Sequence, residues 1–158
     1  MLETHASLLD LLGPELEAEC GLPLTWYDVL LQLSEAPERR LRMSDLADSV
    51  LLSRSGLSRL VDRMVGAGLI ERARCPSDRR GAYAVLTPAG LTKLREAAPV
   101  HLRGVEEHFA RHIDDDEARA LADSLRKVLE AAGGPRGARG CGEAETAAAP
   151  GNGAAAKP

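Results

Sequence analysis

Apolar residues recur three and four positions apart along most of the chain, which is the period of an α-helix. The first such run covers 7–19 and contains Pro14, which would bend the helix or begin a second one. Thr25 is expected to cap the next helix in a capping box completed by Asp28, and Pro37 to end it. The beginning of the chain is therefore predicted to be helical.

Two shorter helices follow in the sequence. The first starts at Ser44 and turns three apolar residues inward, Leu46, Ala47 and Val50. In the second, apolar residues fall at i, i+3, i+4 and i+7, which predicts one buried face, formed by Leu57, Leu60, Val61 and Met64. Gly66 and Gly68 end this helix. Its opposite face is small, hydroxylic and basic, with Ser55, Ser58, Arg59 and Asp62 at the centre and Arg54 and Arg63 on the flanks.

A β-hairpin is predicted after this helix. Two strand-like runs, 69–75 and 82–86, flank the segment 76–81, which has the composition of a turn. Arg79 and Arg80 lie in that turn, so the tip of the hairpin is basic.

Two more helices are predicted beyond the hairpin. Thr87 and Pro88 suit the start of a long helix, whose apolar positions continue to Ile113 and which Pro99 should kink. Four acidic residues at 114–117 then mark the start of a last helix, because negative charge there interacts favourably with the positive end of the helix dipole. The apolar stripe of that last helix is Leu121, Leu125, Val128 and Leu129.

Charge is distributed unevenly along the chain. The formal net charge is −4, but the stretch 39–82 holds ten arginines and five acidic residues and so carries +5. A polyanion would meet this basic stretch rather than the acidic remainder. The last 26 residues, 133–158, contain seven glycines, eight alanines and three prolines, and we expect them to be disordered.

Several classes of protein are disfavoured by the sequence. It contains no apolar run of about 18 residues and no signal peptide, so we expect a cytoplasmic protein that binds no membrane. Its three cysteines, Cys20, Cys75 and Cys141, are odd in number and form no C-x-x-C motif, which argues against a disulfide framework or a structural zinc site. No motif of a hydrolase, a nucleotide-binding enzyme or a dinucleotide-binding enzyme is present, so we expect no enzymatic activity and no cofactor.

Three short helices followed by a hairpin with an arginine tip form the order of a winged helix-turn-helix. The stretch 24–90 resembles the MarR (multiple antibiotic resistance regulator) family, and the helices on either side fit as well. The resemblance is carried by Arg42-Met43-Ser44-Asp45-Leu46-Ala47, by the helix from Ser53 to Met64, by Gly68-Leu69-Ile70, by Asp78-Arg79-Arg80-Gly81 and by Leu86-Thr87-Pro88-Ala89-Gly90.

The resemblance implies a mainly α protein with a small β wing, in which terminal helices form a homodimer around two winged helix-turn-helix domains. The apolar stripes of the terminal helices support dimerisation independently, because each flanking piece is too short for a core of its own. The expected organisation is an N-terminal dimerisation helix at 1–20, a DNA-binding domain at 21–90, C-terminal dimerisation helices at 91–132 and a disordered tail at 133–158.

Double-stranded DNA is the expected partner, and the recognition helix and the wing supply the expected contacts. Arg59 and Ser58 are the candidate readers of base edges, because a guanidinium can bridge two acceptors of guanine in the major groove. Ser53, Arg54, Ser55 and Arg63 are expected to contact phosphates. Arg79 and Arg80 suit a narrow minor groove, and the resemblance implies that Asp78 orients Arg80. The sequence predicts a transcriptional regulator that binds an inverted repeat as a homodimer, and we expect it to be a ligand-responsive repressor.

Alternatives to this interpretation remain open. The resemblance implies that an inducer binds near Trp26 and Tyr27. The i, i+4 pair His108 and His112, beside Glu107, has the spacing of metal ligands but is more simply explained as surface or interface histidines, so no metal is expected. Cys20 and Cys75 are better explained as inert thiols than as a redox switch. A non-specific architectural DNA-binding protein is the other alternative.

Overall fold

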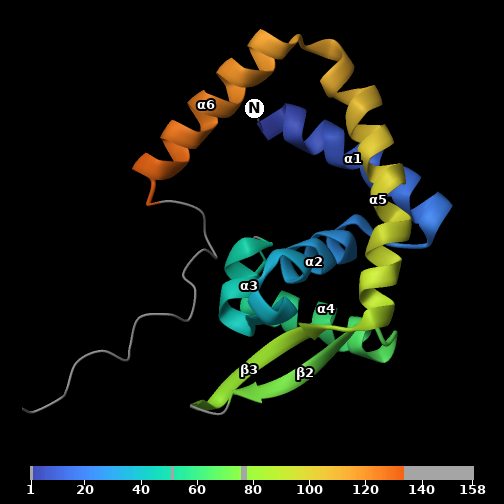
Figure 1. Ribbon diagram of the computed structural model, residues 1–158, viewed down its shortest axis with the longest axis vertical. Helices are drawn as coiled ribbons and strands as arrows, with labels where there is room; N and C mark the ends of the chain where they lie inside the picture. Colours follow the sequence, from blue (N-terminus) through green and yellow to red (C-terminus); the bar gives the residue numbers. More distant parts are fainter. Residues whose placement is uncertain (1, 51, 76–77, 134–158) are drawn as a thin grey trace, which may run out of the picture.

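The structure is a computed structural model that describes residues 2–50, 52–75 and 78–133 (Figure 1). It is mainly helical with one small antiparallel sheet, as the sequence predicts. The elements are α1 (Leu2–Cys20), α2 (Leu24–Glu35), η1 (Pro37–Arg39), β1 (Arg40–Arg42), α3 (Met43–Ser49), α4 (Arg54–Gly66), β2 (Ile70–Cys75), β3 (Asp78–Leu86), α5 (Pro88–His108), η2 (Ala110–His112) and α6 (Asp115–Ala131).

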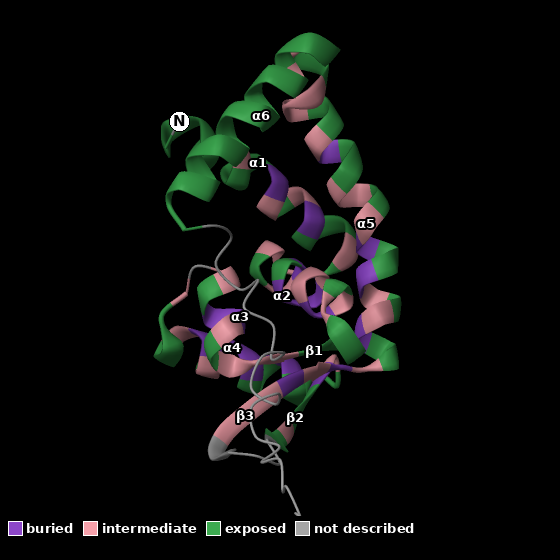
Figure 2. Ribbon diagram, turned by 60° about the vertical axis from the view of Figure 1, so that its left-hand side comes forward, coloured by how far each residue is buried: buried purple, intermediate pink, exposed green. Residues whose placement is uncertain are grey.

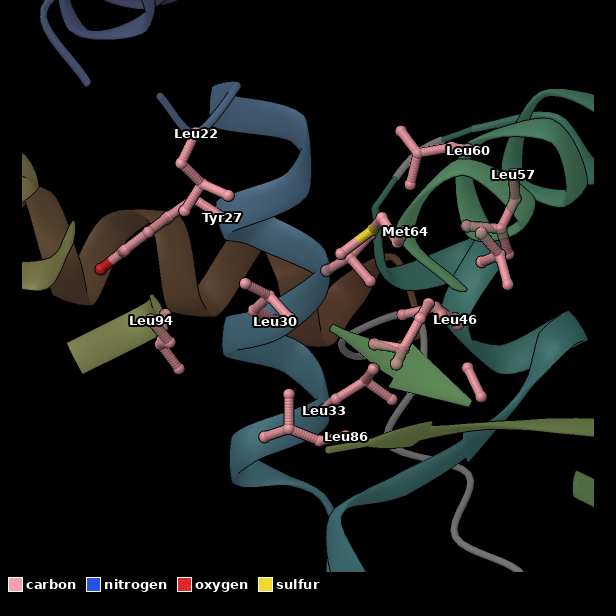
Figure 3. Packing of buried hydrophobic residues seen from close by; sticks show 14 of the residues in the cluster. Leu22, Tyr27, Leu30, Leu33, Leu46, Leu57, Leu60, Met64, Leu86 and Leu94 are labelled. Atoms are coloured by element: carbon pink, nitrogen blue, oxygen red, sulfur yellow. The ribbon is translucent and has the colours of Figure 1, made fainter. Parts of the chain in front are cut away.

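The core lies between α2, α3, α4 and the sheet. Val29, Leu30 and Leu33 of α2 are fully buried, and Figure 3 shows Leu30 and Leu33 in this core. They meet the apolar stripe of α4, in which Leu57, Leu60, Val61 and Met64 are all buried, as predicted. Because these residues occupy one face of α4, its other face is left at the surface.

The sheet has three strands in the order β1-β3-β2, and both pairings are antiparallel. The predicted hairpin is present, but β3 begins at Asp78, so residues 78–81, predicted as turn, belong to the strand. Asp78 pairs with Cys75, and the register shifts between Arg74 and Cys75. The third strand, β1, was not predicted, because a run of three residues carries no periodicity. It forms because Arg42 pairs with Tyr83 and Arg40 with Val85, far along the chain.

Helix boundaries differ from the prediction in three places. α1 begins at Leu2 and continues through Pro14 as one helix. Thr25 does not cap α2, because the amides of Trp26 and Tyr27 already donate to the carbonyl of Pro23, which is the N-cap. α5 also continues through its proline, Pro99, but ends at His108 rather than Ile113.

The terminal helices pack unequally. α1 lies against α5, where Leu12 and Leu16 are buried. α6 is joined to α5 through η2 and has no buried residue, as its colouring in Figure 2 shows. Its leucines remain partly exposed, Leu121 by 42% and Leu125 by 46%. A helix with such an apolar stripe needs a further surface to cover it. The tail from residue 134 lies outside the described residues.

Candidate nucleic-acid interface

The exposed face of α4 is the centre of the candidate site. Ser53 is the N-cap of this helix, and its hydroxyl oxygen accepts a hydrogen bond of 3.1 Å from the amide of Gly56. Beyond the cap, Arg54, Ser55, Arg59 and Arg63 are exposed and Ser58 is half-buried. All six of the predicted contact residues on this helix therefore lie at its surface, within reach of a ligand.

Arg72 of β2 connects the sheet to this face, although no motif in the sequence marked it. Its Nη2 atom lies 2.8 Å from Oδ1 of Asp62 and donates to the backbone oxygen and the Oγ of Ser58, at 3.2 and 3.1 Å. Ile70, two residues earlier on the same strand, is buried. Alternation along the strand places Arg72 on that same face, toward α4, so the sequence did carry a signal.

A cleft of about 470 Å³ opens between α4, α3 and the sheet. Its lining is mostly small or basic and consists of Arg42, Met43, Ser44, Arg54, Ser58, Arg72, Gly81 and Ala82. Three of these residues are arginines and none is acidic. The cleft therefore presents positive charge beside the recognition face of α4, which favours an anionic partner.

β1 contributes Arg42 to this cleft and also carries Arg40. The guanidinium carbons of Arg40 and Arg42 lie 5.3 and 5.6 Å from the centre of the Tyr83 ring, within the range of cation–π contacts. Arg40 also forms an ion pair with Glu38. Glu38 and Arg39 adopt positive φ angles of 52° and 53°. The chain thus takes an uncommon backbone conformation just before the strand that carries these arginines.

The predicted wing residues lie in β3. Asp78, Arg79 and Arg80 form the first part of this strand, and Asp78 is opposite Cys75 of β2. Their side chains lie outside the described part of the structure, and so does the predicted orientation of Arg80 by Asp78. The hairpin places all three at the end of the sheet farthest from α5, as Figure 1 shows.

The predicted ligand region lies where α2 crosses α5. Tyr27 is buried and Trp26 half-buried. Burial raises the pKa of the Tyr27 hydroxyl, and the nearby carboxylates of Asp28 and Glu35 raise it further. Desolvation by the surrounding protein raises the pKa of the Asp28 carboxyl, although this residue is exposed as a whole, and the charge of His101 opposes that shift. The inducer site at Trp26 and Tyr27 stays a prediction.

The histidines of the metal hypothesis do not share one helical face. α5 ends at His108, and His112 belongs to the separate turn η2. Nε2 of His108 lies 2.7 Å from Oε1 of Glu15 in α1, so this imidazole links two helices, while Glu107 is exposed. No group of three or more metal-binding side chains occurs among the described residues. Cys20 is a free, half-buried thiol.

The described helices include none that is long and apolar enough to cross a membrane.

Residues 21–81 match the model of the MarR family. The HTH-type transcriptional regulator MhqR of Bacillus subtilis is 26% identical over 108 residues, which cover 68% of this chain and 72% of MhqR. Two MarR family transcriptional regulators from Streptomyces coelicolor have similar solved structures. AbsC is 38% identical with a TM-score of 0.75, over 83% of this chain and 88% of AbsC. Sco3205, solved in complex with DNA, is 36% identical with a TM-score of 0.76, over 82% of this chain and 81% of its own. The recognition helix, the hairpin and the helices around them thus identify this chain as a member of the MarR family of winged-helix transcriptional regulators.

Proposed function

We propose that this protein binds an inverted-repeat operator as a homodimer and regulates transcription from it. The observation that carries the proposal is the exposed face of α4, where Arg54, Arg59 and Arg63 stand beside the arginine-lined cleft. A helix of this width and charge fits the major groove of B-DNA. The complex of its relative Sco3205 with DNA supports the same use of the fold.

The exposed apolar stripe of α6 supports dimerisation. Four of its residues, Leu121, Leu125, Val128 and Leu129, are between 42% and 67% exposed in the single chain. Leu102 of α5 is also exposed, by 63%. A second copy related by two-fold symmetry would cover these surfaces and place two α4 helices on one face of the DNA. Half-site centres are then expected about 10 base pairs apart, one turn of the duplex.

Roles on the DNA follow from the positions of the side chains. We assign Arg59 and Ser58 to base edges, because both lie on the exposed face of α4. Ser53, Arg54, Ser55 and Arg63 flank them and are assigned to phosphates. The wing residues Asp78, Arg79 and Arg80 are assigned to the minor groove beside each half-site.

The mode of regulation in this proposal is repression, since a dimer that occupies its operator excludes other proteins from that DNA. A small molecule near Trp26 and Tyr27 would relieve it, because this region joins α2 of the winged domain to α5. A ligand that stabilises another packing of these two helices shifts the dimer away from its DNA-binding form. Reporter transcription from the operator with and without the gene for this protein tests repression directly.

The binding proposal is tested by two arginine substitutions on α4. Arg59→Ala is expected to cost about 1–3 kcal/mol on the operator and to relax base preference at one position per half-site. Arg54→Ala removes the same charge and is expected to weaken binding to all sequences alike. Affinity for operator and random duplex, measured at one salt concentration by fluorescence anisotropy, separates the two effects. Equal affinity of the wild-type protein for both duplexes would instead indicate a non-specific architectural protein.

A further inference from the structure

Arg72 of β2 reaches from the sheet to the recognition face of α4. A single nitrogen, Nη2, contacts Asp62 at 2.8 Å and both oxygens of Ser58 at 3.2 and 3.1 Å. This nitrogen carries two hydrogens, so one serves the carboxylate and the other is shared between the two oxygens of Ser58. Both oxygens of Ser58 therefore already accept a hydrogen bond in the protein without DNA.

A serine hydroxyl can donate one hydrogen bond and accept two, so by itself it does not discriminate between donors and acceptors on a base. In this structure the Oγ of Ser58 accepts from Arg72. Within the described part of the chain, the Ser58 hydroxyl donates to no other group. Ser58 also lines the open cleft, so its hydroxyl hydrogen is available to an incoming ligand.

We propose that Arg72 is a positioning residue for specificity, which occupies one of the two acceptor positions of the Ser58 Oγ and so favours donation by this hydroxyl toward the DNA. This inference rests on the proposed function. Guanine, adenine and thymine all present acceptors in the major groove, whereas the amino group of cytosine presents a donor. A serine held in this way therefore disfavours cytosine at the base that it faces.

The ion pair with Asp62 distinguishes this role from a phosphate contact. At 2.8 Å, the carboxylate of Asp62 neutralises the charge of Arg72 locally. The Arg72 side chain is 34% exposed, while that of Asp62 is 64% exposed. The charge of the pair is therefore close to zero, and its contribution to phosphate binding is small. The role that remains for Arg72 is to orient the hydroxyl of Ser58.

The test compares the wild type with four variants on one set of duplexes. The wild-type protein first selects its preferred duplex from a randomised library, and every single base-pair variant of that duplex is then prepared. Affinities of the wild type, Arg72→Met, Ser58→Ala and the double variant are measured on the whole set at two salt concentrations. Arg74→Met is the matched control, because Arg74 is exposed on the same strand and same face and its loss removes the same charge.

In the expected result, Arg72→Met and Ser58→Ala lose preference at the same position of the half-site. Discrimination against cytosine there falls about twofold to tenfold, the range of one neutral hydrogen bond. Arg72→Met has no further effect in the Ser58→Ala background, and Arg74→Met leaves this preference unchanged. Thermal unfolding of each variant confirms that the fold is retained.

Two results overturn the inference while the proposed function stands. One is an unchanged base preference in Arg72→Met. The other is an equal loss of affinity on every duplex with a smaller dependence on salt, which would make Arg72 a phosphate contact. A wild-type protein without any sequence preference overturns the proposed function, and the inference with it.

Discussion

His101 of α5 stacks on Tyr27 of α2, with ring centroids 4.5 Å apart and planes tilted by 36°. The Nδ1 atom of His101 is buried and has no hydrogen-bond partner in the described part of the chain. Burial lowers the pKa of His101 below its ordinary value near 6.5, and the carboxylate of Asp28 opposes this shift. The packing of α2 on α5 therefore favours the neutral imidazole.

This preference predicts that acid weakens the fold. A lowered pKa in the folded state means that the unfolded chain takes up the proton first, so the free energy of unfolding falls as pH drops through about 6.5. Asp28, with a raised pKa, acts with the opposite sign and at lower pH. In His101→Phe, which keeps a ring against Tyr27, the loss of stability between about pH 7.5 and pH 5.5 should be smaller, by at most about 1.4 kcal/mol per pH unit. Urea unfolding at one protein concentration measures this loss of stability in the wild type and in His101→Phe. An equal loss in the two proteins would contradict the prediction.

Thr87 is expected to contribute to the stability of the fold through several hydrogen bonds of one side chain. Its Oγ1 accepts from the amide of Gly90 at 3.0 Å and lies 2.8 and 2.9 Å from the carbonyl oxygens of Gly68 and Leu69. Thr87→Ala should lower the free energy of unfolding by about 1–2 kcal/mol, because the cap of α5 is lost. The control is Thr25→Ala, which removes a threonine that caps no helix and should cost under about 0.5 kcal/mol. Equal effects of the two would show that the cap is not the cause.

Gly90 is expected to tolerate no side chain. A Cβ atom at this position would lie 2.1 Å from the backbone oxygen of Leu69 and 2.9 Å from Cδ1 of Leu86. Gly90→Ala should therefore separate α5 from the hairpin and cost about 1–3 kcal/mol or more. Gly66→Ala is the control, since a Cβ there meets nothing within 4 Å and the change should be neutral or stabilising by up to about 1 kcal/mol. Thermal unfolding of both variants measures these changes in stability.

The apolar stripe of α6 predicts how the dimer can be broken. Replacing Leu121 and Leu125 with glutamine removes about 1.5–3 kcal/mol of burial for each side chain. We expect this variant to be a monomer at micromolar concentration by light scattering. The matched control replaces Asp123 and Lys127 with glutamine, on the opposite face of the same helix, and should remain a dimer. A wild-type protein that is itself monomeric would refute the proposed assembly.

The arginines of the wing are expected to contribute to the salt dependence of DNA binding. Replacing Arg79 and Arg80 together with alanine should lower operator affinity and weaken any preference for A·T-rich flanks. It should also flatten the salt slope by about 0.9 for each phosphate that the variant no longer neutralises. Replacing Arg119 and Arg126 with alanine removes the same charge from the surface of α6 and should leave the slope unchanged. Binding titrations over a range of salt concentrations measure both. An unchanged slope in the wing variant would show that the hairpin tip does not touch DNA.

The sequence was sufficient where a structure depends on neighbours in the chain. The stripe from Leu57 to Met64 and the Thr87 cap are local patterns, and both predictions were confirmed. The prediction for Thr25 was wrong because a capping box is a pattern of residue types, whereas the chain had already turned at Pro23. The end of α5 was also misplaced, since Phe109 and Ile113 keep their apolar spacing although the backbone is no longer helical.

The rest of the candidate site depends on contacts between distant residues. β1 exists only because it pairs with 83–85, and the cleft exists only because β1, α3 and α4 meet there. Arg72 reaches Ser58 from a separate strand, fourteen positions along the chain. Its strand and its face were predictable from alternation, but the atoms that it contacts were not, because they depend on how α4 packs on the sheet.

Thr87, Gly90 and Leu69 join the hairpin closely to the first turn of α5. With 21 residues, α5 is about 31 Å long at about 1.5 Å per residue. A rotation of only about 5° about one end then moves the other by about 3 Å. Near the far end of α5, Gly104 lies against α1, where a Cβ atom would come within 2.7 Å of Leu12 Cδ2 and 3.0 Å of Glu15 Oε2. A rotation of α5 of this size about its Gly104 end would carry the hairpin by a distance close to the rise of one base pair, roughly 3.4 Å.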